Sequence, residues 1–102
     1  AQCAARQGKF WEFHDELFDR QTYLSEEEFA KISKDVELNA ASWKTCYDAR
    51  DTLAIVRKGF EEGKALNVLA TPTIFIGSES YAGAISVDDI SVLIQDALAA
   101  AK

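Results

Sequence analysis

Apolar residues recur three or four positions apart through the first two thirds of the chain, which is the spacing of an amphipathic helix. The pattern is clear over residues 8–20 and again over residues 51–66. In the second stretch, Leu53, Val56 and Phe60 share one face, and lysine and glutamate occupy the other. We therefore expect helices over both stretches.

Two polar residues mark where further helices begin. Ser25 is followed three positions later by Glu28, the arrangement of a capping box, which predicts a helix through about Lys34. Asn39 is a suitable N-cap for a short helix around Trp43. The tryptophans and phenylalanines of these helices are most simply read as core residues.

The pattern changes to strands near Leu69. Residues 73–76 form a β-branched and aromatic run, and a short glycine-containing stretch separates them from Tyr81, which is a hairpin signal. Ser86 then caps a last helix. Its expected inward face consists of Val87, Ile90, Ile94, Ala97 and Leu98. The predicted order is four or five helices, two strands and one helix, an α/β arrangement.

The predicted hairpin poses a physical problem, because two strands alone are only marginally stable in water. The last helix can cover one face, but the outer edge of residues 73–76 stays unpaired. We expect this edge either to complete a larger sheet or to pair with another chain. The first residues read as helix without an N-cap, and Met is absent. We therefore expect the chain to be part of a larger protein.

Composition narrows the classes of partner. The chain has 102 residues, of which 48% are hydrophobic, and a formal charge of −6. The acidic balance argues against a nucleic acid or an anionic membrane as the main partner. No apolar run approaches the ~20 residues of a membrane-spanning helix, so we expect no membrane insertion. Two cysteines and one histidine are too few for a four-ligand zinc site. We expect neither a metal nor another cofactor.

The candidate chemistry is sparse. Cys3 and Cys46 fall on different predicted helices and form no Cys-X-X-Cys pair. Free thiols and a structural disulfide are equally compatible with their spacing, whereas no triad supports a nucleophile. His14, on an aromatic stripe, is more simply a packed residue than a catalytic one. Pro72 is the sole proline, and its simplest reading is a trans proline that precedes a strand.

Several sequence runs occur together in an order typical of one family. The run Cys-Ala-Ala-Arg-Gln-Gly-Lys-Phe-Trp-Glu-Phe-His over residues 3–14 resembles the start of the second half of DsbA-like thiol:disulfide oxidoreductases. The likeness continues through Trp-Lys-Thr-Cys at 43–46 and Gly-Lys-Ala-Leu-Asn-Val at 63–68. It extends through Thr-Pro-Thr-Ile-Phe-Ile-Gly at 71–77 and Tyr-Ala-Gly-Ala at 81–84, and so covers essentially the whole chain.

This resemblance implies a thioredoxin-like fold of which the chain holds only a part. Residues 1–68 would be the helical insertion, and residues 69–102 the closing β-β-α part. The half with the Cys-X-X-Cys would lie outside this sequence. The resemblance further implies that Pro72 is cis and that Thr71 pairs through its backbone with substrate, here cysteine-containing polypeptides. It favours a structural disulfide between Cys3 and Cys46 in a periplasmic or other extracytoplasmic setting.

Without a Cys-X-X-Cys, this chain holds no candidate catalytic residue for dithiol oxidation or isomerisation, and we expect it to be inactive alone. The sequence does not indicate which protein would be the redox partner. One alternative is a domain of the glutathione-dependent isomerases or kappa-type transferases, which share the fold. Another is a non-catalytic module that binds peptides, or forms a homodimer, through the exposed hairpin edge.

Overall fold

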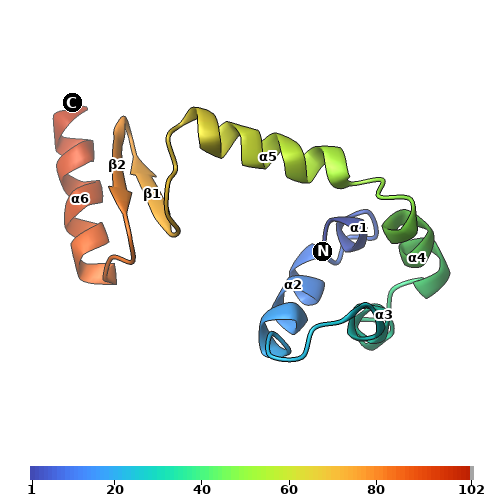
Figure 1. Ribbon diagram of the computed structural model, residues 1–102. Helices are drawn as coiled ribbons and strands as arrows, with labels where there is room; N and C mark the ends of the chain where they lie inside the picture. Colours follow the sequence, from blue (N-terminus) through green and yellow to red (C-terminus); the bar gives the residue numbers. More distant parts are fainter. Residues whose placement is uncertain (102) are drawn as a thin grey trace. The chain divides into compact units, whose positions relative to one another are not determined.

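The computed structural model describes residues 1–101, and within them it contains five α-helices, two β-strands and a last α-helix (Figure 1). The elements are α1 (Gln2–Ala5), α2 (Phe10–Asp19), α3 (Glu26–Asp35), α4 (Ala40–Asp48), α5 (Leu53–Ala65), β1 (Thr73–Ile76), β2 (Glu79–Ala82) and α6 (Val87–Ala100). The predicted order of elements is confirmed.

Backbone contacts divide the chain into two compact units, Ala1–Lys58 and Gly59–Lys102. The division falls inside α5. The boundary expected after residue 68 rests on the change from helices to strands and on the family resemblance, not on contacts, and it stays a prediction.

The core of the first unit is built from α1, α2, α3 and α4. The Phe13 ring stacks on Trp43 with 5.7 Å between ring centroids, and Trp43 stacks on Tyr47 at 5.1 Å. The buried apolar residues are Cys3, Ala4, Phe13, Ile32, Leu38, Trp43 and Cys46. All of these except Leu38, which lies between α3 and α4, come from four short helices, so each helix depends on the others for burial of its apolar face.

Two helix starts follow the predicted side-chain caps. The Oγ atom of Ser25 accepts a hydrogen bond from the Glu28 backbone N–H at 3.2 Å. The Oδ1 atom of Asn39 accepts one from the Ser42 N–H at 3.0 Å. Only half of the expected capping box forms, however. The Glu28 carboxylate binds Arg20 at 3.3 Å, since an ionised partner offers a stronger hydrogen bond than a backbone amide.

Three helices end at a residue in the left-handed region that is not glycine: Glu37 with φ 61°, Arg50 with φ 55° and Asn67 with φ 59°. At the end of α3, the Leu38 N–H donates to the Ser33 carbonyl at 2.9 Å. This is the hydrogen bond of a Schellman motif, and the ends of α4 and α5 repeat it. The motif satisfies carbonyl groups that a helix end otherwise leaves open.

Some aromatic residues do not belong to the core, contrary to the sequence reading. Trp11 is 65% exposed, Phe18 is 61% exposed and Phe60 is 66% exposed. Helix α2 carries apolar side chains on more than one face, and in the first unit only the face with Phe13 is covered. The prediction that all tryptophans and phenylalanines are core residues is therefore wrong.

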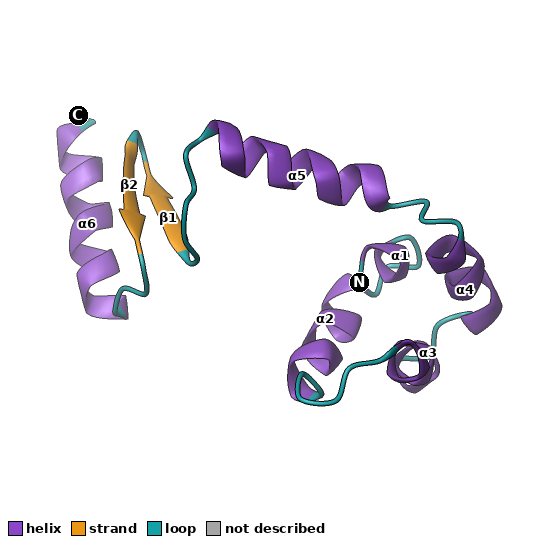
Figure 2. Cartoon of the chain, in the orientation of Figure 1, coloured by secondary structure: helices purple, strands orange, loops and turns teal. Residues whose placement is uncertain are grey.

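The second unit contains the predicted hairpin, shown as two adjacent arrows in Figure 2. Strands β1 and β2 are antiparallel, with Ile76 opposite Glu79 and Thr73 opposite Ala82. A two-residue turn joins them, and its first residue, Gly77, has φ 62°, a conformation that glycine adopts without steric cost.

Helix α6 begins as predicted, since the Oγ atom of Ser86 accepts a hydrogen bond from the Asp89 N–H at 3.1 Å. The helix lies against β1. The predicted inward face is only partly covered, however: Val87 is 80% exposed and Leu98 is 61% exposed. A sheet of two four-residue strands is too small to bury a helix of 14 residues.

Candidate functional site

The Thr71–Pro72 segment lies in the loop before β1, and both residues are exposed. The peptide bond between them is cis. The Pro72 carbonyl accepts a hydrogen bond from the Gly83 N–H at 2.7 Å, which continues the hairpin ladder past the last strand pair. The Thr73 hydroxyl donates to the Ala70 carbonyl. The segment is thus held to the sheet on one side and open on the other.

The outer edge of β1 follows from this ladder. Hydrogen-bonded and non-hydrogen-bonded pairs alternate in an antiparallel sheet. Because Pro72 is hydrogen-bonded to Gly83, the backbone groups of Thr73 and Phe75 point away from β2. In the described two-stranded sheet these groups have no strand partner. An extended polypeptide can pair with such an edge.

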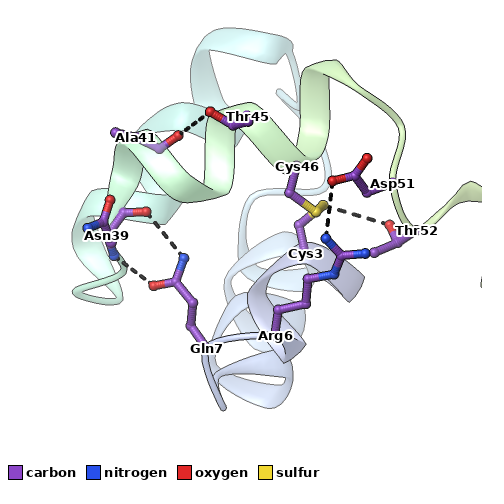
Figure 3. Close-up of a disulfide and its surroundings, with 9 residues drawn as sticks. All are labelled: Cys3, Arg6, Gln7, Asn39, Ala41, Thr45, Cys46, Asp51 and Thr52. Carbon is purple, nitrogen blue, oxygen red and sulfur yellow. Dashed lines mark hydrogen bonds and ion pairs between the residues drawn. A yellow bond between two sulfur atoms is a disulfide. The ribbon is translucent and has the colours of Figure 1, made fainter.

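The two cysteines are joined by a disulfide that links α1 to α4, with 5.9 Å between the Cα atoms (Figure 3). Cys3 is 7% exposed and Cys46 is 5% exposed. The free-thiol reading of the sequence therefore does not hold, and the disulfide reading does. The spacing alone did not decide this, because a pairing across 43 positions depends on tertiary structure.

Three further side chains gather beside the disulfide in Figure 3. The Thr52 Oγ1 atom lies 3.7 Å from the Cys3 Sγ atom. A disulfide sulfur carries no proton, so the hydroxyl is the donor of this weak hydrogen bond. The Arg6 Nη1 atom lies 3.1 Å from Asp51 Oδ2 in an exposed ion pair. The disulfide therefore has polar neighbours on one side.

Two cavities of the first unit share the disulfide as part of their walls. One measures about 530 Å³ and has a polar rim, with Arg6, Gln7, Ser42, Thr45 and Asp51 around the two cysteines. The other measures about 460 Å³ and is lined mainly by apolar side chains, including Phe13, Leu17, Phe29, Trp43 and Leu53. Small molecules can therefore approach the disulfide from solvent.

The run Gln7-Gly8-Lys9 forms a connection that the sequence did not indicate. The Gln7 side chain donates to the Asn39 carbonyl at 3.2 Å and accepts from the Asn39 N–H at 2.8 Å. The Lys9 ammonium donates to the Val36 carbonyl at 2.8 Å. Gly8, with φ 73°, supplies the turn between them. In the sequence, Gln7, Gly8 and Lys9 contributed only to the family resemblance. The feature that could have indicated this connection is a pair of polar residues on either side of a glycine between two predicted helices.

His14 lies on α2 among aromatic rings, with 4.8 Å between its centroid and that of Phe18. Its Nδ1 atom is 3.0 Å from Asp15 Oδ1.

Among residues 1–101, no group of three or more His, Cys, Asp or Glu residues could hold a metal ion. In the same range, no helix combines the length and the apolar character needed to cross a membrane.

Comparison with known proteins places the chain in a family. A family model described as thioredoxin matches residues 1–96. Over its full length the chain is 24% identical to a stretch of the Na⁺/H⁺ antiporter NhaA 3 of Salinispora tropica, and it covers 16% of that protein. Over 82% of its length it is 32% identical to the Na⁺/H⁺ antiporter NhaA of Nitrosospira multiformis, of which it covers 14%. No solved structure matches it. Because the family model covers nearly the whole sequence, the chain belongs to the thioredoxin family.

Proposed function

We propose that the chain is the substrate-binding part of a DsbA-like thiol:disulfide oxidoreductase, acting on cysteine-containing segments of secreted proteins. The observation that carries the proposal is the exposed Thr71–Pro72 segment, which continues directly into the unpaired edge of β1. Thr71, Thr73 and Phe75 alternate along that edge. An extended substrate segment can bind there by adding a strand.

Dithiol chemistry requires a reactive thiolate, which proteins typically generate at a helix N-terminus or in a Cys-X-X-Cys pair. The chain has two cysteines, and because they are bonded to each other, neither is a free thiolate. The proposal therefore assigns the catalytic dithiol to another part of a longer protein. The chain spans 16% and 14% of the lengths of the two curated relatives.

The proposal places the protein in the periplasm or another extracytoplasmic compartment. Disulfides persist in oxidising compartments and are rare where thiols are kept reduced. The bond between Cys3 and Cys46 supports such a setting.

Nuclear magnetic resonance titration tests the binding step. The labelled chain is mixed with an extended peptide whose cysteine is replaced by serine, so that only noncovalent binding is measured. We expect the largest shift changes at Thr71, Thr73 and Phe75. Thr73→Pro removes an edge N–H and should abolish binding. Thr73→Val keeps the N–H and should bind, and so should Ser80→Pro, which alters the outer edge of β2 instead.

Shift changes confined to the apolar cavity, or equal binding by Thr73→Pro, would contradict the proposal.

The unpaired edge also favours a second candidate function, a module that dimerises through β1. Sedimentation of the unmixed chain separates the two. A dimer that Thr73→Pro dissociates would favour the second candidate, whereas a monomer that binds peptide favours the first.

A further inference from the structure

We infer that the Cys3–Cys46 disulfide is a site of reversible thiol exchange, at which a low-molecular-weight thiol forms a mixed disulfide with Cys46 and releases Cys3 as a thiolate. This site lies in the first unit and does not involve the Thr71–Pro72 segment. The inference therefore stands or falls independently of the proposed function.

Access to the disulfide comes from the polar-rimmed cavity of about 530 Å³. Both cysteines line this cavity, and neither is completely covered, since 7% of Cys3 and 5% of Cys46 remain exposed. A cavity of this size holds a small ligand, but it is too small for a folded protein. The attacking molecule is therefore a small thiol.

The two sulfur atoms have different surroundings, and this difference determines which one leaves. The Thr52 hydroxyl donates to the Cys3 sulfur at 3.7 Å, from a position that is itself only 9% exposed. The Cys46 sulfur has no comparable donor among the described residues. A hydrogen bond to a sulfur that becomes a thiolate strengthens as its negative charge develops. Cys3 is therefore the better leaving group, and the thiol attacks Cys46.

The positive charge of Arg6 beside the cavity also favours Cys3 as the leaving group. Arg6 follows Cys3 by three positions, and both residues line the cavity. A guanidinium in this place favours a thiolate at Cys3. Asp51 pairs with Arg6 at 3.1 Å and weakens this effect. Substitutions of Arg6 and Asp51 should therefore change the exchange rate in opposite directions.

The exchange step balances without any additional oxidant. The electron pair of the attacking thiolate forms a new S–S bond to the Cys46 sulfur. The bond between Cys46 and Cys3 breaks, and its electron pair passes to the Cys3 sulfur. A second thiolate then attacks the bound thiol's sulfur, which releases the oxidised disulfide of the small thiol and the Cys46 thiolate. Two thiols are oxidised as the protein disulfide is reduced, and α1 is no longer tied to α4.

The test uses glutathione with the folded, oxidised chain. Samples are quenched with acid, remaining thiols are blocked with N-ethylmaleimide, and the modified cysteine is identified by peptide mass spectrometry. We expect glutathione on Cys46 and the blocking group on Cys3, at a rate proportional to the glutathione concentration. Thr52→Val should slow the reaction roughly fivefold, as expected for loss of one hydrogen bond. Asp51→Asn should accelerate it, and Arg6→Gln should slow it, each about threefold.

Thr45→Val is the matched control. Thr45 lines the same cavity, but its hydroxyl donates to the Ala41 carbonyl at 3.0 Å, so its removal should leave the rate unchanged. Circular dichroism establishes that each variant is folded. Glutathione on Cys3, or equally on both cysteines, would overturn the inference. A rate independent of glutathione concentration would also overturn the inference, because unfolding and not thiol attack would then limit the reduction. This measurement needs only the unsubstituted chain.

Discussion

The Nη2 atom of Arg20 lies 2.7 Å from the Oδ2 atom of Asp35. The same guanidinium also contacts the carboxylates of Glu16 and Glu28. The hydrogen bond to Asp35 is the main cause that raises the pKa of Arg20 above its ordinary value. Glu28 and Asp35 lie in the first and last turns of α3, so one side chain at the end of α2 holds α3 at both ends.

Replacing Arg20 should therefore destabilise the first unit. Arg20→Met retains much of the aliphatic volume but removes three ion pairs and leaves the three carboxylates to repel one another. We expect a clear decrease in the melting temperature. Lys44→Met is the control, because Lys44 forms one exposed pair with Asp48, and such pairs contribute little. Equal melting temperatures for the two variants would show that the Arg20 cluster contributes no more than a surface pair.

Removal of the disulfide should lower the free energy of unfolding of the first unit by about 4 kcal/mol in the chain-entropy model. The bond closes a loop between positions separated by 43 residues. The variant is Cys3→Ala combined with Cys46→Ala, which leaves no unpaired thiol. Guanidinium denaturation followed by tryptophan fluorescence measures the change, since both tryptophans lie in the first unit. An unchanged midpoint would mean that the unfolded chain is already compact without the bond.

Phe13→Ala should cost about 3–5 kcal/mol in stability, because it leaves a cavity against Trp43. Phe13 is 2% exposed, and its ring stacks on that of Trp43. Phe18→Ala, on the same helix, is the control. Phe18 is 61% exposed, so its replacement should cost less than about 1 kcal/mol. Thermal denaturation of both variants, followed by circular dichroism, shows whether only the Phe13 face of α2 contributes to stability or the Phe18 side contributes as well.

Glu37→Gly should stabilise the protein by about 1 kcal/mol, although glycine usually destabilises. Glu37 adopts φ 61° at the end of α3, where an ordinary side chain is strained. Glu27→Gly, in the first turn of the same helix, should instead destabilise by about 1 kcal/mol. Urea denaturation of the two variants gives the comparison. The idea fails if both substitutions shift the midpoint in the same direction.

Three helix starts could be predicted from their capping side chains, and the ends of α2, α3 and α5 lie close to the predicted ones, but how the helices end could not be predicted. Ser25, Asn39 and Ser86 each cap a helix through their own side chain, and the sequence displays that side chain directly. The ends at Glu37 and Arg50 depend on backbone hydrogen bonds around a left-handed residue. With no glycine at either position, the sequence carries no local signal for them.

Burial and pairing were harder to predict than secondary structure. Periodicity identifies the apolar face of a helix, but it does not show what covers that face. Trp11 and Val87 both lie on apolar stripes and are 65% and 80% exposed. The partnership of Cys3 with Cys46 likewise depends on how α1 and α4 meet. The cavity beside this disulfide could not be predicted from the sequence, because its lining residues come from separate segments.

The double hydrogen bond between Gln7 and Asn39 has a consequence for which side chains position 7 can accept. A side-chain amide here imitates a peptide group, giving one hydrogen and receiving another. Glutamate offers no hydrogen, lysine offers no lone pair, and asparagine is one methylene too short to reach with both atoms. The requirement is for reach and two-way bonding rather than charge, so this link between distant segments should persist unchanged from acid to alkaline solution.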